Sequence, residues 1–482
     1  MLKSDLVQTD KHSIIILLRR KNLRFLRRTN LIQNRCKTLP KTIMKKKIQK
    51  IEFKESEVFK DNSKLTFFNE NTLENEIPKI IFLLGNNGSG KTSILNYLYN
   101  GLAEGRKGFY GSTKLKKGTK FNIYITNENP EIEVTVDQSG IKSSKYPESI
   151  KIIFDEVNTT FNIEKITSVT ALTADEDKNP KERASDLGKM IPQLLANIKA
   201  EDDAYIADYI SEHNNIPDYN KKLDRFTNAF DKMYDGTKKF KKILNEDGEK
   251  KIIFIDNLGN AVNMSSFSTG EKQIVFRVGN LLKNLNNLEN GIILIDEPET
   301  SLHPKWQRKY IKFLLDTFEG LDIQFIIATH SPYILQGIKE GESVAIKIDR
   351  NNKDENGNDI LEIGEKIGYY PNSLKNPSIN LINYLAYGIV DELLHIELFT
   401  ALEVKNNVNY NALKSILNNN SDISQKNHTA TVRYGGINIG DSISESLPVF
   451  IRNSLHHPDE RARTYSQEEL ETSINKMLDL IE

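Results

Sequence analysis

The sequence predicts an α/β domain followed by a helical region, and three observations support this fold class. An apolar run at Ile80–Leu84 is followed by a glycine-rich turn and a helical pattern. Two further apolar runs end in polar side chains, at Asp296 and at His330. After Tyr370 the strand-like patterns give way to helical ones. Apolar runs without alternation are typical of strands buried on both faces of a parallel sheet.

The glycine-rich turn fits the pattern GxxxxGK[ST], whose backbone N–H groups face phosphate oxygens. Its residues, with the serine that follows, are Gly85, Asn86, Asn87, Gly88, Ser89, Gly90, Lys91, Thr92 and Ser93. The lysine of such a loop reaches the β- and γ-phosphates, and the Thr92 hydroxyl can bind Mg²⁺. The order of strand, loop and helix is the context that this loop requires, so we expect ATP and Mg²⁺ to bind here.

Two neighbouring carboxylates end the apolar run at Ile292–Ile295. Asp296 is placed to hold Mg²⁺, and Glu297 to orient and deprotonate the attacking water. His330 ends the next apolar run. A lone histidine after a strand is more often structural than catalytic. Its place in the ordered set of motifs favours a catalytic role here.

These motifs resemble those of ABC-type ATPases. The segments that carry the resemblance are a degenerate LSGGQ-like signature at 268–271, a D-loop-like stretch at 298–304 and a switch-histidine segment at 328–332. The resemblance implies that Ser268 and Gly270 of one subunit close over the γ-phosphate held by Lys91 of another. A homodimer, or a higher homo-oligomer joined through the ATP site, is then the minimum active unit.

Composition and charge are those of a globular chain of 482 residues, 38% hydrophobic and 27% charged. No stretch approaches 18 apolar residues, so no segment is expected to span a membrane, and no membrane partner is expected for the ATPase body. The one cysteine, Cys36, fits a reducing compartment and a cytoplasmic location. The net charge of zero divides into +9 on residues 1–43 and −9 on residues 44–482. Any RNA or DNA contact of the ATPase body must therefore be local.

Residues 1–43 are expected to be a basic N-terminal extension with little packed structure. Eleven Lys or Arg residues stand there against two Asp residues. Such a segment is compatible with a nucleic-acid or membrane-surface arm, or with an organellar presequence. The stretch from Met44 looks like a natural protein start, so we favour the interpretation that residues 1–43 are an upstream extension of the reading frame.

Residues 44–372 are expected to form the ATPase domain. Alternating apolar residues at 121–125 and 132–136 predict the strands of an antiparallel β lobe. A helical insertion is expected at about 172–246, and it is too short for a long coiled-coil arm. Within it, the cluster Lys238–Lys242 is interpreted as a solvated helix face, with a local nucleic-acid contact as the alternative.

Residues 373–482 are expected to form an all-α domain. One apolar face is predicted to run through a single long helix that carries Ile382, Leu385, Ile389, Leu393 and Ile396. A final helix is predicted to open with a capping box, in which Ser466 and Glu469 satisfy each other's backbone N–H groups.

Arg452 and Asn453, followed by His457, resemble the R-[polar]-x3-H motif of HEPN domains, helical modules that often act as metal-independent ribonucleases. The resemblance implies an arginine on the phosphate and a histidine at the reacting oxygen. On a helix, however, Arg452 shares a face with His456, and His457 points about 140° away. The alternative is a dimerising helical cap in which these histidines only end a helix.

The chain from Met44 looks like the stand-alone ABC-type ATPases of bacterial antiphage defence, relatives of OLD and Septu proteins. A DxD motif of the OLD-type metal-dependent nuclease does not follow His330. Two functions remain open. ATP hydrolysis could control an intrinsic HEPN ribonuclease, or the chain could be a sensor or scaffold that recruits a separately encoded nuclease partner.

Overall fold

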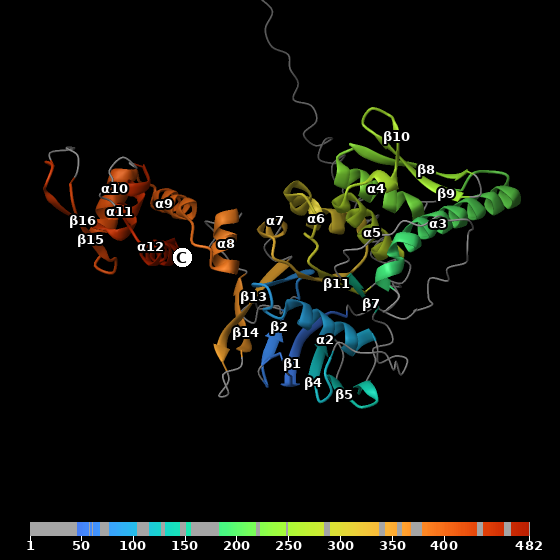
Figure 1. The fold of residues 1–482 in the computed structure, drawn as a ribbon, viewed down its shortest axis with the longest axis horizontal. Helices are drawn as coiled ribbons and strands as arrows, with labels where there is room; N and C mark the ends of the chain where they lie inside the picture. Colours follow the sequence, from blue (N-terminus) through green and yellow to red (C-terminus); the bar gives the residue numbers. More distant parts are fainter. Residues whose placement is uncertain are drawn as a thin grey trace, which may run out of the picture. The chain divides into compact units, whose positions relative to one another are not determined.

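The computed structural model describes most of the chain from Lys46 onwards (Figure 1). It describes residues 46–481 except for 57, 60, 68–76, 104–114, 127–130, 145–150, 156–182, 218–221, 247–248, 284–289, 337–342, 354–358, 368–377, 431–436 and 457–463. The predicted extension at 1–43 lies outside these residues, and so does the first part of the predicted insertion.

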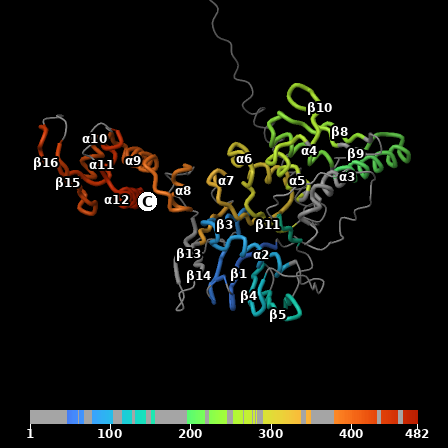
Figure 2. The backbone as a smooth tube through the Cα atoms, viewed as in Figure 1, coloured from blue at the N-terminus to red at the C-terminus, as the bar shows by residue number. Residues whose placement is uncertain are grey.

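A six-stranded sheet forms the centre of the ATPase part, with strand order β14-β13-β3-β12-β11-β7. These strands are β3 (Ile80–Leu84), β7 (Ile152–Asp155), β11 (Ile292–Asp296), β12 (Gln324–Ala328), β13 (Ser343–Lys353) and β14 (Asp359–Ile367). All neighbours pair in parallel except β13 and β14. Figure 2 shows β3 and β11 in one sheet although they are far apart in the sequence. The parallel strands predicted from unbroken apolar runs are present.

Both faces of this sheet are buried. In β3, Ile80 and Phe82 belong to one apolar cluster, and Ile81 and Leu83 belong to another. Helices α5 (Thr269–Lys283) and α6 (Pro304–Thr317) cover the first face. Helix α2 (Lys91–Ala103) covers the second. This double coverage explains why the strands lack alternation.

An antiparallel sheet of five strands shares the second cluster with α2, with order β2-β1-β4-β5-β6. Its strands are β1 (Ile48–Glu55), β2 (Lys64–Thr66), β4 (Lys120–Ile125), β5 (Ile132–Asp137) and β6 (Gly140–Ser143). The predicted alternation is confirmed in β4 and β5, where Phe121, Ile123, Ile132 and Val134 are all buried. The antiparallel lobe predicted from these residues is therefore present.

The predicted insertion is only partly helical. Its helices are α3 (Arg183–His213) and α4 (Lys222–Tyr234), and it continues as β8 (Lys238–Glu246), β9 (Glu249–Asp256) and β10 (Ala261–Asn263) of a three-stranded antiparallel sheet. The helical prediction was wrong for Lys238–Lys242, which lies on β8. Lys238 pairs with Glu271 at the start of α5, and its ammonium lies 4.6 Å from the centre of the Phe267 ring. The lysine-rich composition concealed a strand whose pairing with β9 is long-range.

The C-terminal region has its own apolar core and is not purely helical. Its helices are α8 (Ile379–Tyr387), α9 (Glu392–Asn406), α10 (Tyr410–Asn418), α11 (Leu447–His456) and α12 (Gln467–Ile481). Strands β15 (Gln425–Thr429) and β16 (Ser442–Ser446) form an antiparallel pair between α10 and α11. The all-helical expectation therefore omitted this pair.

The single long helix predicted through Ile382 and Ile396 was also wrong. Gly388 ends α8 in the left-handed conformation, with φ of 68°, and Asp391 caps the N-terminus of α9. Ile389 and Leu393 are consequently 50% and 58% exposed. Glycine is the usual residue for such a helix end because it carries no Cβ.

The capping box predicted for the last helix is confirmed. The N–H of Ser466 donates to Oε2 of Glu469 at 2.9 Å, and the N–H of Glu469 donates to Oγ of Ser466 at 3.2 Å. The helix that follows buries Leu470, Ile474 and Met477 in the C-terminal core.

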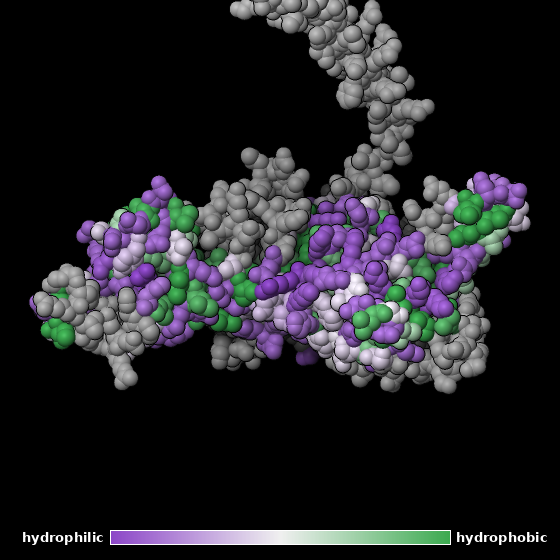
Figure 3. Space-filling model, turned by 90° about the horizontal axis from the view of Figure 1, so that it is seen from above, coloured by the Kyte–Doolittle hydropathy of each residue, from purple (hydrophilic) through white to green (hydrophobic). Residues whose placement is uncertain are grey.

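Helix α8 also packs against the ATPase part. Its Ile382 and Ala386 belong to the same apolar cluster as Ile334 and Leu335 of α7 (Pro332–Leu335), the short helix that follows His330. The described surface in Figure 3 is mainly polar, with separate apolar areas. Among the described helices, none is both long and apolar enough to cross a bilayer.

Candidate functional site

The phosphate-binding loop connects the end of β3 to the start of α2. Gly85 has a φ of 142°, and a Cβ there would lie 2.3 Å from the carbonyl oxygen of Ile348. Only glycine fits that position. The buried ammonium of Lys91 donates to the carbonyl oxygens of Gly85 at 2.9 Å and Asn86 at 3.1 Å.

Burial lowers the pKa of Lys91 to about 8, while the carboxylates of Glu297, Asp296 and Glu299 oppose the shift. The negative charges of three acids thus act on the ammonium of the loop. Phosphate oxygens are the acceptors for which a lysine in such a loop is suited, because they supply charge as well as hydrogen bonds.

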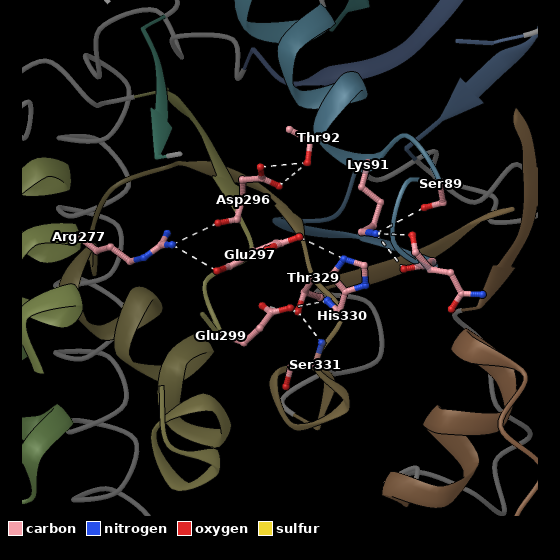
Figure 4. Close-up of polar contacts among 12 residues, drawn as sticks. Ser89, Lys91, Thr92, Arg277, Asp296, Glu297, Glu299, Thr329, His330 and Ser331 are labelled. Atoms are coloured by element: carbon pink, nitrogen blue, oxygen red, sulfur yellow. Dashed lines mark hydrogen bonds and ion pairs between the residues drawn. The ribbon is translucent and has the colours of Figure 1, made fainter. Parts of the chain in front are cut away.

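Asp296 and Thr92 meet at the other side of the loop (Figure 4). The Thr92 hydroxyl lies 3.1 Å from Oδ1 and 3.0 Å from Oδ2 of Asp296. Burial raises the pKa of Asp296 to about 6, and the negative charge of Glu297 acts in the same direction, whereas the Thr92 hydrogen bond lowers it. A buried carboxylate beside a hydroxyl and a second carboxylate fits a divalent cation.

The residues fit Mg²⁺ better than a metal held wholly by the protein. Within the described residues, no group of three or more His, Cys, Asp or Glu side chains could hold a metal ion. Mg²⁺ is commonly bound through one or two protein oxygens together with phosphates and waters. Thr92 and Asp296 would supply these protein oxygens.

Glu297 follows β11 directly and has a φ of 39°, an uncommon conformation for a residue with a side chain. Such strain costs about 1 to 3 kcal/mol and persists only where the surroundings enforce it. The N–H of Thr300 donates to the Glu297 carbonyl oxygen at 3.1 Å, and Arg277 donates to the same oxygen at 3.3 Å. These contacts fix the Glu297 backbone.

His330 meets Glu297 across the strand ends. Its Nε2 lies 3.2 Å from Oε1 of Glu297. Burial lowers the pKa of His330, and the ammonium of Lys91 lowers it further, against the opposing effects of Glu297 and Glu299. A neutral imidazole at this place can donate one hydrogen bond to the carboxylate.

Sequence reasoning missed three side chains of this site, which are Arg277, its partner Asp155, and Glu299. Arg277 of α5 is buried, forms an ion pair with Asp155 at 2.6 Å, and donates to the carbonyl oxygens of Asp296 and Glu297, both at 3.3 Å. Glu299 binds the segment that carries His330. The position of Arg277 on the apolar face of α5, beside Ile274 and Val278, was the available signal.

The signature segment begins α5. Ser268 is exposed and forms a capping box with Glu271, through contacts of 2.8 Å and 3.3 Å. Gly270 is buried, and a Cβ on it would lie 2.3 Å from the carbonyl oxygen of Ser301. The signature therefore touches the stretch that follows Glu297 within the same chain.

The C-terminal candidate site is incomplete in the described residues. Arg452 lies on α11, with its guanidinium 4.1 Å from the centre of the Tyr410 ring, and the Tyr410 hydroxyl donates to Asn453 at 2.6 Å. His456 ends α11 and is exposed. His457 lies outside the described residues. Arg452 and Asn453 therefore take part in packing within the C-terminal core.

A central parallel sheet with a phosphate-binding loop after β3 and a carboxylate pair after β11 defines a P-loop NTPase of the ABC-ATPase type. The chain belongs to the family described as "AAA domain, putative AbiEii toxin, Type IV TA system", whose model matches residues 80–336.

Curated relatives match short segments of the chain. "Retron Vc95 probable ATPase" of Vibrio cholerae is 40% identical over 86 residues, which are 16% of each protein. "Septu protein PtuA" of Bacillus thuringiensis is 29% identical over 110 residues, 20% of this chain and 27% of that protein. The chain thus spans well under a third of the length of either relative. The SMC head domain of Thermotoga maritima aligns over 66% of this chain and 99% of its own, with 15% identity and a TM-score of 0.36.

Proposed function

We propose that this chain binds ATP with Mg²⁺ and hydrolyses it between two copies of itself. The observation that carries this proposal is the convergence of Lys91, Thr92, Asp296, Glu297 and His330 at the ends of β3, β11 and β12. These side chains provide the groups that phosphoryl transfer to water requires: a cation for the phosphates, ligands for Mg²⁺, and a base.

In the proposed site, residues 85–93 and the Lys91 ammonium bind the phosphates. Thr92 and Asp296 would hold Mg²⁺, which would supply positive charge beside the phosphates. Glu297 orients the attacking water and accepts its proton, and the hydrogen bond from His330 holds the Glu297 carboxylate in place. Ser268, the exposed residue of the signature, would complete the site at the γ-phosphate of a second copy, so that turnover requires a dimer. Gly270 would act by letting this segment pack closely on Ser301 of its own chain.

The test is Mg²⁺-dependent ATP turnover by the full chain at several protein concentrations. Specific activity should rise with protein concentration and disappear when Mg²⁺ is chelated by EDTA. Constant specific activity down to concentrations at which light scattering detects only monomer would contradict the composite site. Turnover indistinguishable from buffer at every concentration would contradict the ATPase itself.

We also propose that this cycle controls a C-terminal function in antiphage defence. The similarity to retron and Septu proteins, and a family described with a toxin system, support the setting. The position of Arg452 favours a docking surface for a separately encoded partner over an intrinsic HEPN ribonuclease. A guanidinium 4.1 Å from the centre of the Tyr410 ring contributes about 0.5 to 2 kcal/mol through a cation–π contact. This contact supports a structural role for Arg452.

Substitution of the histidines separates the two C-terminal functions. His456→Ala and His457→Ala should leave cellular RNA patterns and ATP turnover as in the wild type if the helices are a docking surface. Loss of RNA cleavage in either variant, with the thermal midpoint unchanged, would instead support the HEPN ribonuclease. Arg452→Lys serves as a packing control, because it retains the charge but not the planar guanidinium.

A further inference from the structure

Glu299 lies in the turn that leaves β11, and its side chain points back to the end of β12 (Figure 4). Oε1 of its carboxylate accepts a hydrogen bond from the backbone N–H of His330 at 2.5 Å, and Oε2 accepts one from the Thr329 hydroxyl at 2.8 Å. Both oxygens thus bind consecutive residues of the segment that carries the histidine. Hydrogen bonds to a charged acceptor are about twice as strong as neutral ones.

The turn that aims Glu299 is set by the backbone of Glu297. The Glu297 N–H donates to the carbonyl oxygen of Ala328 at 2.9 Å. This hydrogen bond extends the pairing of β11 with β12 by one residue beyond the end of β11. The positive φ of Glu297 then reverses the chain, and the N–H of Leu302 donates to the Glu299 carbonyl oxygen at 2.9 Å. The Glu299 carboxylate is consequently fixed opposite the end of β12.

A second tie joins the same two segments without involving His330. The Gln307 side chain donates to the Leu302 carbonyl oxygen at 2.8 Å, and its own oxygen accepts from the Ser331 hydroxyl at 2.5 Å. Gln307 therefore stabilises the turn against α7. Glu299 is the residue of the turn that binds the backbone of His330 itself.

We propose that Glu299 is a positioning residue for ATP hydrolysis, which holds the His330 backbone so that the imidazole keeps the Glu297 carboxylate in place as the base. This inference rests on the proposed ATPase function. The charges of three carboxylates act on the loop lysine, and each carboxylate has a different role. Asp296 lies at the proposed Mg²⁺ site, Glu297 is placed to bind the attacking water, and Glu299 binds the protein backbone. Glu299 thus acts through His330 and not on the nucleotide.

A double-mutant cycle tests this role in the full chain. Glu299→Gln keeps the size of the side chain but removes its charge and one acceptor oxygen. It should lower kcat about tenfold, less than the roughly 10²-fold that a 1 Å misplacement of a reacting group can cost, with KM for ATP changed less than twofold. In the His330→Ala background the same change should have no further effect on kcat, because the residue through which Glu299 acts is already lost.

Gln307→Ala is the matched control, since it loosens the same turn without contacting His330. Gln307→Ala can have its own effect on kcat. In the double mutant with His330→Ala, the fold-change in kcat should equal the product of the two single fold-changes. If Glu299→Gln also multiplies with His330→Ala, or raises KM alone, Glu299 does not act through His330 and the proposal is overturned.

Hydrogen exchange of the nucleotide-free protein separates this inference from the proposed function. Glu299→Ala should speed amide exchange at 329–331 relative to wild type, because the His330 N–H loses its acceptor. Unchanged exchange would overturn the contact whatever the enzyme does. If exchange speeds up but the wild type shows no ATP turnover, the contact stands, the ATPase proposal fails, and the positioning role fails with it.

Discussion

Nε2 of His330 lies 3.2 Å from Oε1 of Glu297, although 33 positions separate the two residues in the sequence. They meet because β11 and β12 are parallel neighbours and end on the same edge of the sheet. The imidazole and the carboxylate are thus brought together by the register of two buried strands. Substitutions at this edge should therefore separate nucleotide binding from turnover.

Lys91→Ala should abolish ATP binding, whereas Glu297→Gln should bind ATP normally and turn over at least roughly 10²-fold more slowly. The lysine supplies charge to the phosphates, and the glutamate acts only on the water. Fluorescent-nucleotide titration and steady-state phosphate release measure the two effects. Glu319→Gln, in the exposed turn after α6, is the matched control. Turnover of Glu297→Gln within a factor of two of wild type would remove Glu297 from the role of base.

An ATP-stabilised dimer should form in the Glu297→Gln protein and be lost when Ser268→Ala is added. The Ser268 hydroxyl is exposed, as required for a contact with a second copy. It also caps α5, so its loss costs about 1 kcal/mol in the same chain. Ser466→Ala removes the same kind of cap from α12 and is the control. Light scattering with ATP should show a dimer for Ser466→Ala and a monomer for Ser268→Ala; equal masses would refute the composite site.

Asp155→Ala should destabilise the ATPase part by about 3 to 5 kcal/mol, because it leaves the buried guanidinium of Arg277 without its partner carboxylate. The loss of stability is measured as the shift in the urea midpoint, with hydrogen exchange of the β11 amides as the probe of unfolding. Lys312→Ala at the exposed ion pair with Asp316 should change stability by less than about 1 kcal/mol. Similar effects of the two substitutions would show that Arg277 does not depend on Asp155.

Acidification should weaken the C-terminal core through His395. This buried histidine contacts the Ser473 hydroxyl at 2.9 Å, and burial lowers its pKa from 6.5 to about 3. The unfolded chain therefore binds the proton first as pH falls. Stability that is fully present above pH 6.5 is lost between pH 6.5 and about 3.

Through His395, the free energy of unfolding of the C-terminal core should fall by up to about 1.4 kcal/mol per pH unit below pH 6. His395→Gln cannot titrate, so it should remove this part of the slope. Hydrogen exchange of α9 and α12 at pH 7.5, 6.0 and 5.0 measures the opening free energies in both proteins. Parallel pH profiles for wild type and variant would show that His395 is protonated in the folded state as well.

The central part of the site could be predicted from the sequence because its motifs are local. A loop such as 85–93 must follow a strand and open a helix, and that requirement needs no long-range information. The positions of Asp296 and His330 then follow from parallel pairing. The caps are equally local, and the one at Ser466 was predicted from four consecutive residues.

The remaining features depend on pairings that sequence patterns do not contain. Arg277 and Asp155 are 122 positions apart, and neither residue type indicates its partner. The strand at Lys238–Lys242 is stabilised by β9 and by Glu271, against the low β-propensity of lysine. Gly388 was a visible break signal, but the apolar positions on either side fitted a single helical period and concealed it.

The packing of α8 on α7 has a thermodynamic consequence for any partner of the C-terminal helices. The hydroxyl of Tyr387, at the end of α8, is buried, and burial together with the negative charge of Glu299 raises its pKa. The first C-terminal helix thus rests on the segment after His330. If ATP changes how α7 packs on α8, a partner that recognises the changed α8 must alter ATP affinity by the same factor. The C-terminal helices would then report nucleotide occupancy to the partner and partner occupancy to the nucleotide.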